Sequence, residues 1–175
     1  MKKVYLVLAS LGVLALLPFN ASARIGETVE QCNQRYGKAR YTNQSPALIN
    51  GVPSLTYSYQ GWLIKTSFLK KHAAMVRYYQ MGCHKIQDDE LQAVLKGEAN
   101  GGQWKEKSRK SLNPVKNLQN LFIRPRLWKN SNGTIAYFET SSYSSLIIET
   151  PIVTQYKKAK AEAAEKKRKS SIPEF

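Results

Sequence analysis

The residues best suited to chemistry are Cys83 and His84, which adjoin each other, and Asp88 shortly after them. A thiolate and an imidazole can bind a soft metal with Cys32 or Asp88 as a further ligand, or Cys83 can act as a nucleophile if its pKa is lowered. A structural metal site needs four ligands at defined spacing, and the chain has no C-x-x-C or H-x-x-x-H motif. We therefore predict no metal, no cofactor and no catalytic residue. A hydrolase or thiol enzyme with an unfamiliar site near these residues is the alternative.

Other motifs of catalysis are absent from the chain, including G-x-S-x-G, H-E-x-x-H, the Walker loop and G-x-G-x-x-G. Asp88-Asp89-Glu90 has the composition of an acidic catalytic cluster. The dipole of a helix favours acids in its first turn, which explains all three residues without chemistry. His72 follows two lysines, and we expect it to be a solvated surface residue.

The stretch Met1–Ala23 has the pattern of a secretory signal peptide, with Lys2-Lys3, an apolar run over 4–17 and Ala21-Ser22-Ala23 at its end. An uncleaved anchor is the alternative, but a membrane span needs about 20 apolar residues and this run is shorter. We predict cleavage after Ala23, no transmembrane segment in what remains, and a periplasmic or secreted protein. In an oxidising compartment Cys32 and Cys83 are expected to form a disulfide; two separate buried thiols are the alternative.

The composition favours an anionic partner. Of the 27 basic and 12 acidic residues, the signal peptide holds two lysines, so the remaining 152 residues carry a net charge of +13. Anionic lipid, acidic polysaccharide and an acidic face of an envelope protein all fit this charge. Nucleic acid is disfavoured by secretion and by the lack of a DNA- or RNA-binding motif. The sequence specifies no oligomeric state.

Two short amphipathic helices are predicted. Thr28 and Gln31 form a capping box before Val29–Tyr36, whose apolar face points Cys32 toward the core, and Gly37 ends this helix. A second helix follows Asp88 as its N-cap, with its buried face at Leu91, Val94 and Leu95 and its end at Gly97.

Alternating apolar and polar residues predict two groups of three strands. The first group covers 55–60, 62–68 and 73–81, and the second covers 127–129, 134–140 and 145–150, with Asn132-Gly133 as a hairpin turn. Between the groups, Lys105–Asn120 is predicted to be an exposed loop. The fold class is therefore α+β, with short helices packed on three-stranded antiparallel meanders in two tandem α-β-β-β units. The domain spans 24–150, with sub-repeats at 24–82 and 83–150.

The tail, 151–175, is predicted to be a basic helical or disordered extension that does not pack, because it lacks an apolar stripe. Together with aromatic residues of the sheet, it defines the predicted binding surface. Aromatic residues are enriched at contact hot spots, and basic residues near an anionic bilayer contribute about 1 kcal/mol each. The residues of this surface are Tyr57, Tyr59, Trp62, Trp104, Trp128, Lys157, Lys158, Lys166, Lys167 and Arg168.

A resemblance rests on Gly26-Glu27-Thr28, Glu30 and Tyr36-Gly37. This segment resembles the first helix of the BamE/SmpA outer-membrane assembly lipoproteins and of the β-lactamase inhibitor protein, whose fold lays short helices on antiparallel sheets. Arg35-Tyr36-Gly37 and Gly101-Gly102-Gln103-Trp104 are also similar to motifs of other secreted bacterial proteins. Unlike the lipoproteins, the chain lacks a lipid-attachment cysteine. The resemblance implies a non-enzymatic interaction module, so we expect a binding module for a protein or an anionic envelope component.

Overall fold

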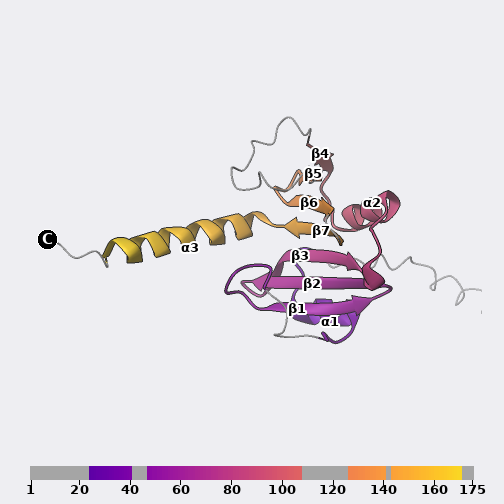
Figure 1. Cartoon of the computed structure of the whole chain (residues 1–175), viewed down its shortest axis with the longest axis horizontal. Helices are drawn as coiled ribbons and strands as arrows, with labels where there is room; N and C mark the ends of the chain where they lie inside the picture. Colours follow the sequence, from indigo (N-terminus) through magenta and orange to yellow (C-terminus); the bar gives the residue numbers. More distant parts are fainter. Residues whose placement is uncertain (1–23, 41–46, 108–125, 141–142, 171–175) are drawn as a thin grey trace, which may run out of the picture.

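A computed structural model describes residues 24–40, 47–107, 126–140 and 143–170. Within them, seven strands form one antiparallel sheet in the order β1-β2-β3-β7-β6-β5-β4 (Figure 1). The strands are β1 (Ser54–Tyr59), β2 (Trp62–Leu69), β3 (His72–Gln80), β4 (Trp104–Glu106), β5 (Arg126–Asn130), β6 (Ile135–Thr140) and β7 (Ser144–Glu149). The helices are α1 (Val29–Tyr36), α2 (Asp88–Gly97) and α3 (Pro151–Ser170), with a short 3-10 turn, η1 (Met81–Cys83).

The α+β class is confirmed, whereas the two separate three-stranded meanders are wrong. The second half has four strands, because Trp104–Glu106, which extends into the predicted loop at Lys105, pairs with β5. Strand β3 also pairs with β7, from Met75 opposite Glu149 to Tyr79 opposite Ser145. This pairing merges the two halves into one sheet, so the sub-repeats are not independent units.

Helix α1 has the predicted bounds and cap. The backbone N–H of Thr28 donates to Gln31 Oε1 at 2.8 Å, and the N–H of Gln31 donates to Thr28 Oγ1 at 3.3 Å. Helix α2 begins one residue earlier than predicted, because Gln87 and not Asp88 is its N-cap. The Gln87 N–H donates to a carboxylate oxygen of Glu90 at 2.8 Å, which is the bond that the third helical residue returns to the N-cap in a capping box.

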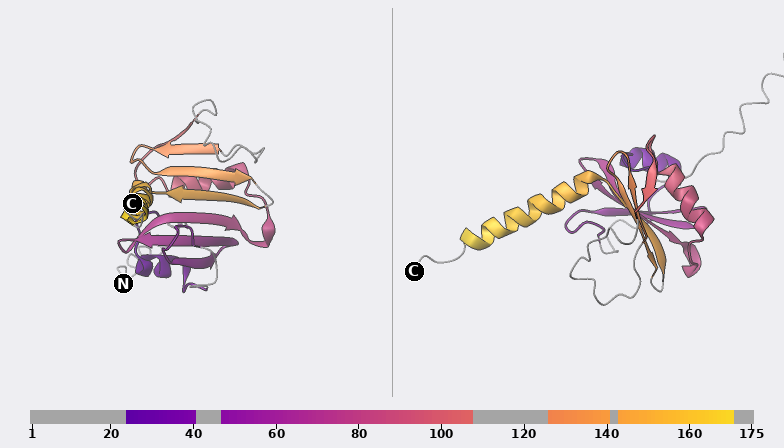
Figure 2. Two further views of the ribbon diagram at one scale, coloured as in Figure 1. Left: turned by 60° about the vertical axis from the view of Figure 1, so that its left-hand side comes forward. Right: turned by 90° about the horizontal axis from the view of Figure 1, so that it is seen from above.

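Different elements pack on the two faces of the sheet. Helices α1 and α2 lie on one face, and their buried residues share one cluster with the sheet (Figure 2). Tyr57, Tyr78 and Leu146 belong to this cluster. Because successive residues of a strand point to opposite faces, Ile147 points to the other face, where it packs in a smaller cluster with residues of α3 and of the 48–52 loop.

Helix α3 leaves the sheet at the end of β7 and projects beyond it (Figures 1 and 2). Its first turns pack, contrary to prediction: Val153 is fully buried, and Ile152 and Tyr156 are half-buried beside it. Further along, Lys160 Nζ donates to the Asn50 carbonyl oxygen at 2.7 Å. Within the described residues, no helix is long and apolar enough to cross a membrane.

Replacing Val153 by Ala should detach the base of α3. We expect a loss of about 2 kcal/mol in the free energy of unfolding, because the side chain is fully buried and truncation leaves a cavity. Urea unfolding measures the change. Thr154→Ala, at the next and exposed position, is the matched control and should cost less than about 0.5 kcal/mol. Equal losses in the two variants would contradict the packing described here.

Candidate functional site

The outer part of α3 is the most strongly charged surface among the described residues. From Lys157 to Lys169 it carries seven basic and two acidic side chains, and every residue in this stretch is exposed. Its ion pairs among the described residues include Lys157 with Glu149 of β7, Lys158 with Glu162, and Arg168 and Lys169 with Glu165. Exposed pairs of this kind contribute little to stability. The net charge of +5 therefore remains available to a partner.

The base of α3 fixes the direction of this charged surface. Pro151 occupies the first helical position. A backbone N–H at this position would have no partner within the helix, so proline is tolerated there. Just before it, the N–H and the hydroxyl of Thr150 both donate to the Ala74 carbonyl oxygen of β3, at 2.9 and 3.1 Å. These bonds, with buried Val153, join the helix to the sheet on two strands.

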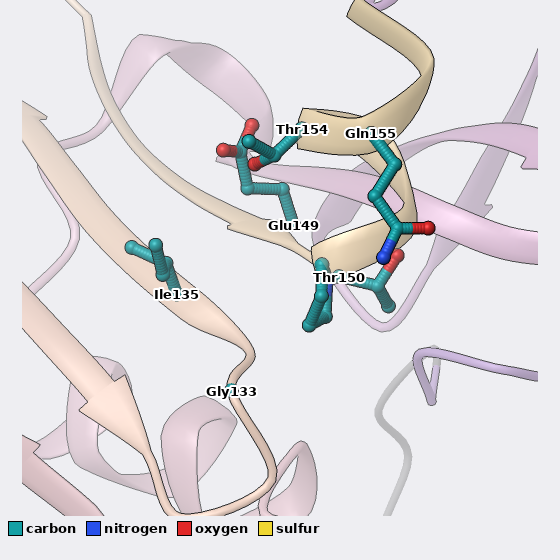
Figure 3. Close-up of a pocket in the computed structure, with 7 residues that line it drawn as sticks. Gly133, Ile135, Glu149, Thr150, Thr154 and Gln155 are labelled. Carbon is teal, nitrogen blue, oxygen red and sulfur yellow. The ribbon is translucent and has the colours of Figure 1, made fainter. Parts of the chain in front are cut away.

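A pocket of about 290 Å³ lies beside the base of α3 (Figure 3). Its residues come from the end of β7, the start of α3 and the connection from β5 to β6. They are Gly133, Ile135, Glu149, Thr150, Pro151, Thr154 and Gln155. Glu149 is the one ionisable residue of this lining, and Lys157 Nζ pairs with it at 3.1 Å. The other polar side chains of the lining are the hydroxyls of Thr150 and Thr154 and the amide of Gln155.

The aromatic half of the predicted binding surface belongs to the core. Tyr57 is 0% and Trp128 3% exposed, so neither lies at the surface, and Tyr59, Trp62 and Trp104 are half-buried against the main cluster. Trp104 Nε1 donates to the Leu95 carbonyl oxygen at 2.7 Å, which fixes this indole under α2. The alternation of residues along the strands was predicted correctly. The prediction of an exposed aromatic surface was wrong, because these rings lie on the face of the sheet that α1 and α2 cover.

The basic half of that surface is exposed as predicted. Lys157, Lys158, Lys166, Lys167 and Arg168 all lie on the outer part of α3. Lys166 and Lys167 make no ion pair with any described residue. The structure thus separates the predicted binding residues into buried aromatic rings and exposed basic side chains.

The described side chains of the alternative site near Cys83 lie at the surface. His84 is exposed, and Asp88, 81% exposed, pairs with Arg126 Nη1 at 2.6 Å. The side chain of Cys83 lies outside the described residues. Asp88, Asp89 and Glu90 form the first turn of α2, as predicted. In the part of the chain that the structure describes, no three His, Cys, Asp or Glu side chains gather as metal ligands.

Cys32 is a free, fully buried thiol, so the structure contains no disulfide at this position. Burial, together with the nearby Glu27 carboxylate, raises its pKa to about 12. At neutral pH the side chain is therefore protonated, and a buried protonated thiol is a poor nucleophile. Its bond with Cys83 stays a prediction.

A buried acid, Glu98, escaped the sequence analysis. It caps the C-terminus of α2 and is 1% exposed. Its carboxylate accepts hydrogen bonds from the Tyr78 hydroxyl at 2.5 Å and from the Ile25 N–H at 2.9 Å. Burial raises the pKa of Glu98 to about 7, against the lowering effect of these two bonds. An acid at a helix C-terminus opposes the helix dipole, and this was the one signal in the sequence that pointed to a special role.

Two tyrosine hydroxyls of the main core cluster, those of Tyr36 and Tyr57, are buried without a hydrogen-bond partner among the described residues. Their rings pack at a centroid distance of 5.5 Å. Burial raises the pKa of both tyrosines, so both stay neutral. The arrangement is a polar cluster inside the core, closed to solvent and unsuited to bind a partner.

No family model, curated protein or solved structure matches the chain. The resemblance to the BamE/SmpA lipoproteins and to the β-lactamase inhibitor protein therefore stays a prediction.

Glu98 predicts a pH dependence of stability. Its folded pKa of about 7 exceeds the ordinary value of 4.5, so between these pH values the folded state holds a proton that the unfolded state has lost. Stability from this group is greatest below pH 4.5, falls as the pH rises toward 7, and then levels off, a total loss of about 3 kcal/mol.

The measurement is urea unfolding of the wild type and of Glu98→Gln across this pH range. The variant has one acceptor for two donors, so we expect it to be less stable at pH 4.5 by about 1–3 kcal/mol. Its deficit should shrink as the pH rises. Glu162→Gln, at an exposed position of α3, is the matched control. Parallel pH curves for Glu98→Gln and the wild type would show that the pKa of Glu98 is the same in the folded and unfolded states.

Proposed function

We propose that the protein is a non-enzymatic binding module of the bacterial envelope that attaches to an anionic lipid surface through α3. The observation that carries this proposal is the exposed outer part of α3, with seven basic and two acidic side chains between Lys157 and Lys169. A helix that packs only by its first turns and then projects as a charged rod is suited to contact a partner.

The chemistry of the contact is electrostatic. Ammonium and guanidinium groups attract the phosphates of lipid headgroups, and each basic residue near such a surface contributes about 1 kcal/mol. Because α3 beyond Lys157 has no large apolar side chain, it has nothing to insert among acyl chains. Attachment should therefore be peripheral, reversible and sensitive to salt.

Two other polyanions fit this surface less well. Proteins that bind single-stranded nucleic acid stack bases on aromatic side chains, and none occurs in α3 beyond Tyr156. The aromatic rings that could have contacted a polysaccharide, Tyr57 and Trp128, lie in the core. The 13 residues from Lys157 to Lys169 form a helical rod about 20 Å long. An anionic bilayer presents an extended surface of negative charge that such a rod can contact along its length.

The folded body holds the rod in place. Thr150 and Val153 join α3 to the sheet, and Lys160 joins it to the 48–52 loop. The second candidate, an enzyme near Cys83, His84 and Asp88, gains no support from the geometry, because Asp88 is engaged by Arg126 on the surface.

The test is cosedimentation of the purified protein with vesicles of equal parts phosphatidylglycerol and phosphatidylcholine, at low salt and at about 0.5 M salt. Lys166→Gln combined with Lys167→Gln should weaken binding about 25-fold at low salt, from about 1 kcal/mol per residue. Lys105→Gln combined with Lys107→Gln removes the same charge from exposed positions in β4 and directly after it, and is the matched control.

Binding that survives high salt, or that falls equally in both double variants, would show that α3 is not the contact. Retention on vesicles of phosphatidylcholine alone would rule out recognition of anionic headgroups. Circular dichroism of each variant checks that α3 stays helical.

A further inference from the structure

The turn between β2 and β3 carries lysines where glycine is favoured. Lys70 and Lys71 connect the paired residues Leu69 and His72, and both have positive φ, 51° and 69°. A two-residue hairpin turn with positive φ at both positions favours Asn-Gly, because an L side chain is strained there. Lysine at both positions is therefore a costly choice.

Two other turns of the chain show the usual solution. Gln60-Gly61, between β1 and β2, has φ values of 45° and 82°, and Asn100-Gly101 has 44° and 76°. Each of these turns places glycine second. Among the described residues, Lys70-Lys71 is the one pair of adjacent positive-φ residues without a glycine. Residues in such sparsely populated backbone conformations are held by the surrounding structure, and they cluster at functional sites.

The turn lies at the end of the sheet from which α3 projects (Figure 1). Leu69, the residue before the turn, packs in the cluster that contains Val153 of α3. At the other side of the turn, Ala74 accepts the two hydrogen bonds from Thr150 that precede α3. Both lysines are exposed. The hairpin tip and the basic helix therefore present their charges at the same end of the molecule.

We propose that Lys70 and Lys71 form a second contact with the anionic lipid surface that α3 binds. This inference rests on the proposed function and adds a specific geometry to it. Contact along α3 alone does not fix which side of the molecule faces the membrane, because the whole molecule can roll about the axis of α3. A second pair of ammonium groups at the base of the helix selects one orientation, so the sheet is presented to the surrounding solution by a defined side.

The test replaces the turn with the residues that its backbone favours, Lys70→Asn together with Lys71→Gly. Relief of strain should raise the urea midpoint of unfolding, while the loss of two charges should weaken binding to vesicles of equal parts phosphatidylglycerol and phosphatidylcholine. We expect binding about 5- to 25-fold weaker at low salt, from up to about 1 kcal/mol per lysine. Opposite changes in stability and binding are not expected from residues that serve the fold alone.

Two further variants separate charge from turn geometry. Lys70→Gln with Lys71→Gln removes the charges and keeps side chains at both positive-φ positions, so binding should fall as before while the unfolding midpoint stays near that of the wild type. Lys105→Gln with Lys107→Gln, at exposed positions in β4 and directly after it, is the matched control and should bind almost as the wild type does.

The outcomes distinguish this inference from the proposed function. If the wild type does not bind these vesicles, the proposed function is wrong and the inference is wrong with it. If the wild type binds, the α3 variant does not, and both turn variants bind as the wild type does, α3 stands as the contact and the hairpin tip is excluded. If the turn variants lose binding to an immobilised acidic polysaccharide but vesicles never bind, the lipid surface is overturned as the partner.

Discussion

The pairing of β3 with β7 is the interaction on which the rest of the structure depends. It joins residues near 75 with residues near 149 and makes one continuous sheet from two antiparallel meanders. Without it, each half would be a small sheet with one helix, too small to bury much apolar surface. With it, α1 and α2 share a single core on the same face, and Tyr78 and Leu146, opposite each other on the two strands, lie at its centre.

The same pairing decides where α3 leaves the body. Strand β7 ends beside the start of β3, so Thr150 meets Ala74 and the helix begins over the second face of the sheet. That face has a modest apolar cluster, enough to hold Val153 and the first turns. The remaining turns carry no apolar stripe and extend away from the sheet. Position at the end of a central strand, and not the composition of α3, makes the helix project.

Local features were predictable from the sequence, and pairings between distant segments were not. Capping residues and apolar spacing predicted α1 and α2 closely, and alternation predicted six of the seven strands described here. Period-two patterns specify which residues share a face, but not which face a helix covers. For this reason Tyr57 and Trp128 were expected at a surface and lie in the core. Strand β4 was missed because three residues are too few to show alternation, and buried Glu98 was missed because its partners, Ile25 and Tyr78, are distant in sequence.

The order of the strands also has a consequence for how the chain folds. Strand β3 is complete by residue 80, yet its second neighbour, β7, is the last strand of the chain. Until its distant partner is in place, this central strand has an edge of unpaired backbone N–H and C=O groups. Ala74, Met75 and Val76 also make the strand apolar on both of its faces. Such contacts between distant residues slow folding, and open edges invite pairing with other chains. The docking of β7 therefore also removes an edge at which a second chain could pair with β3.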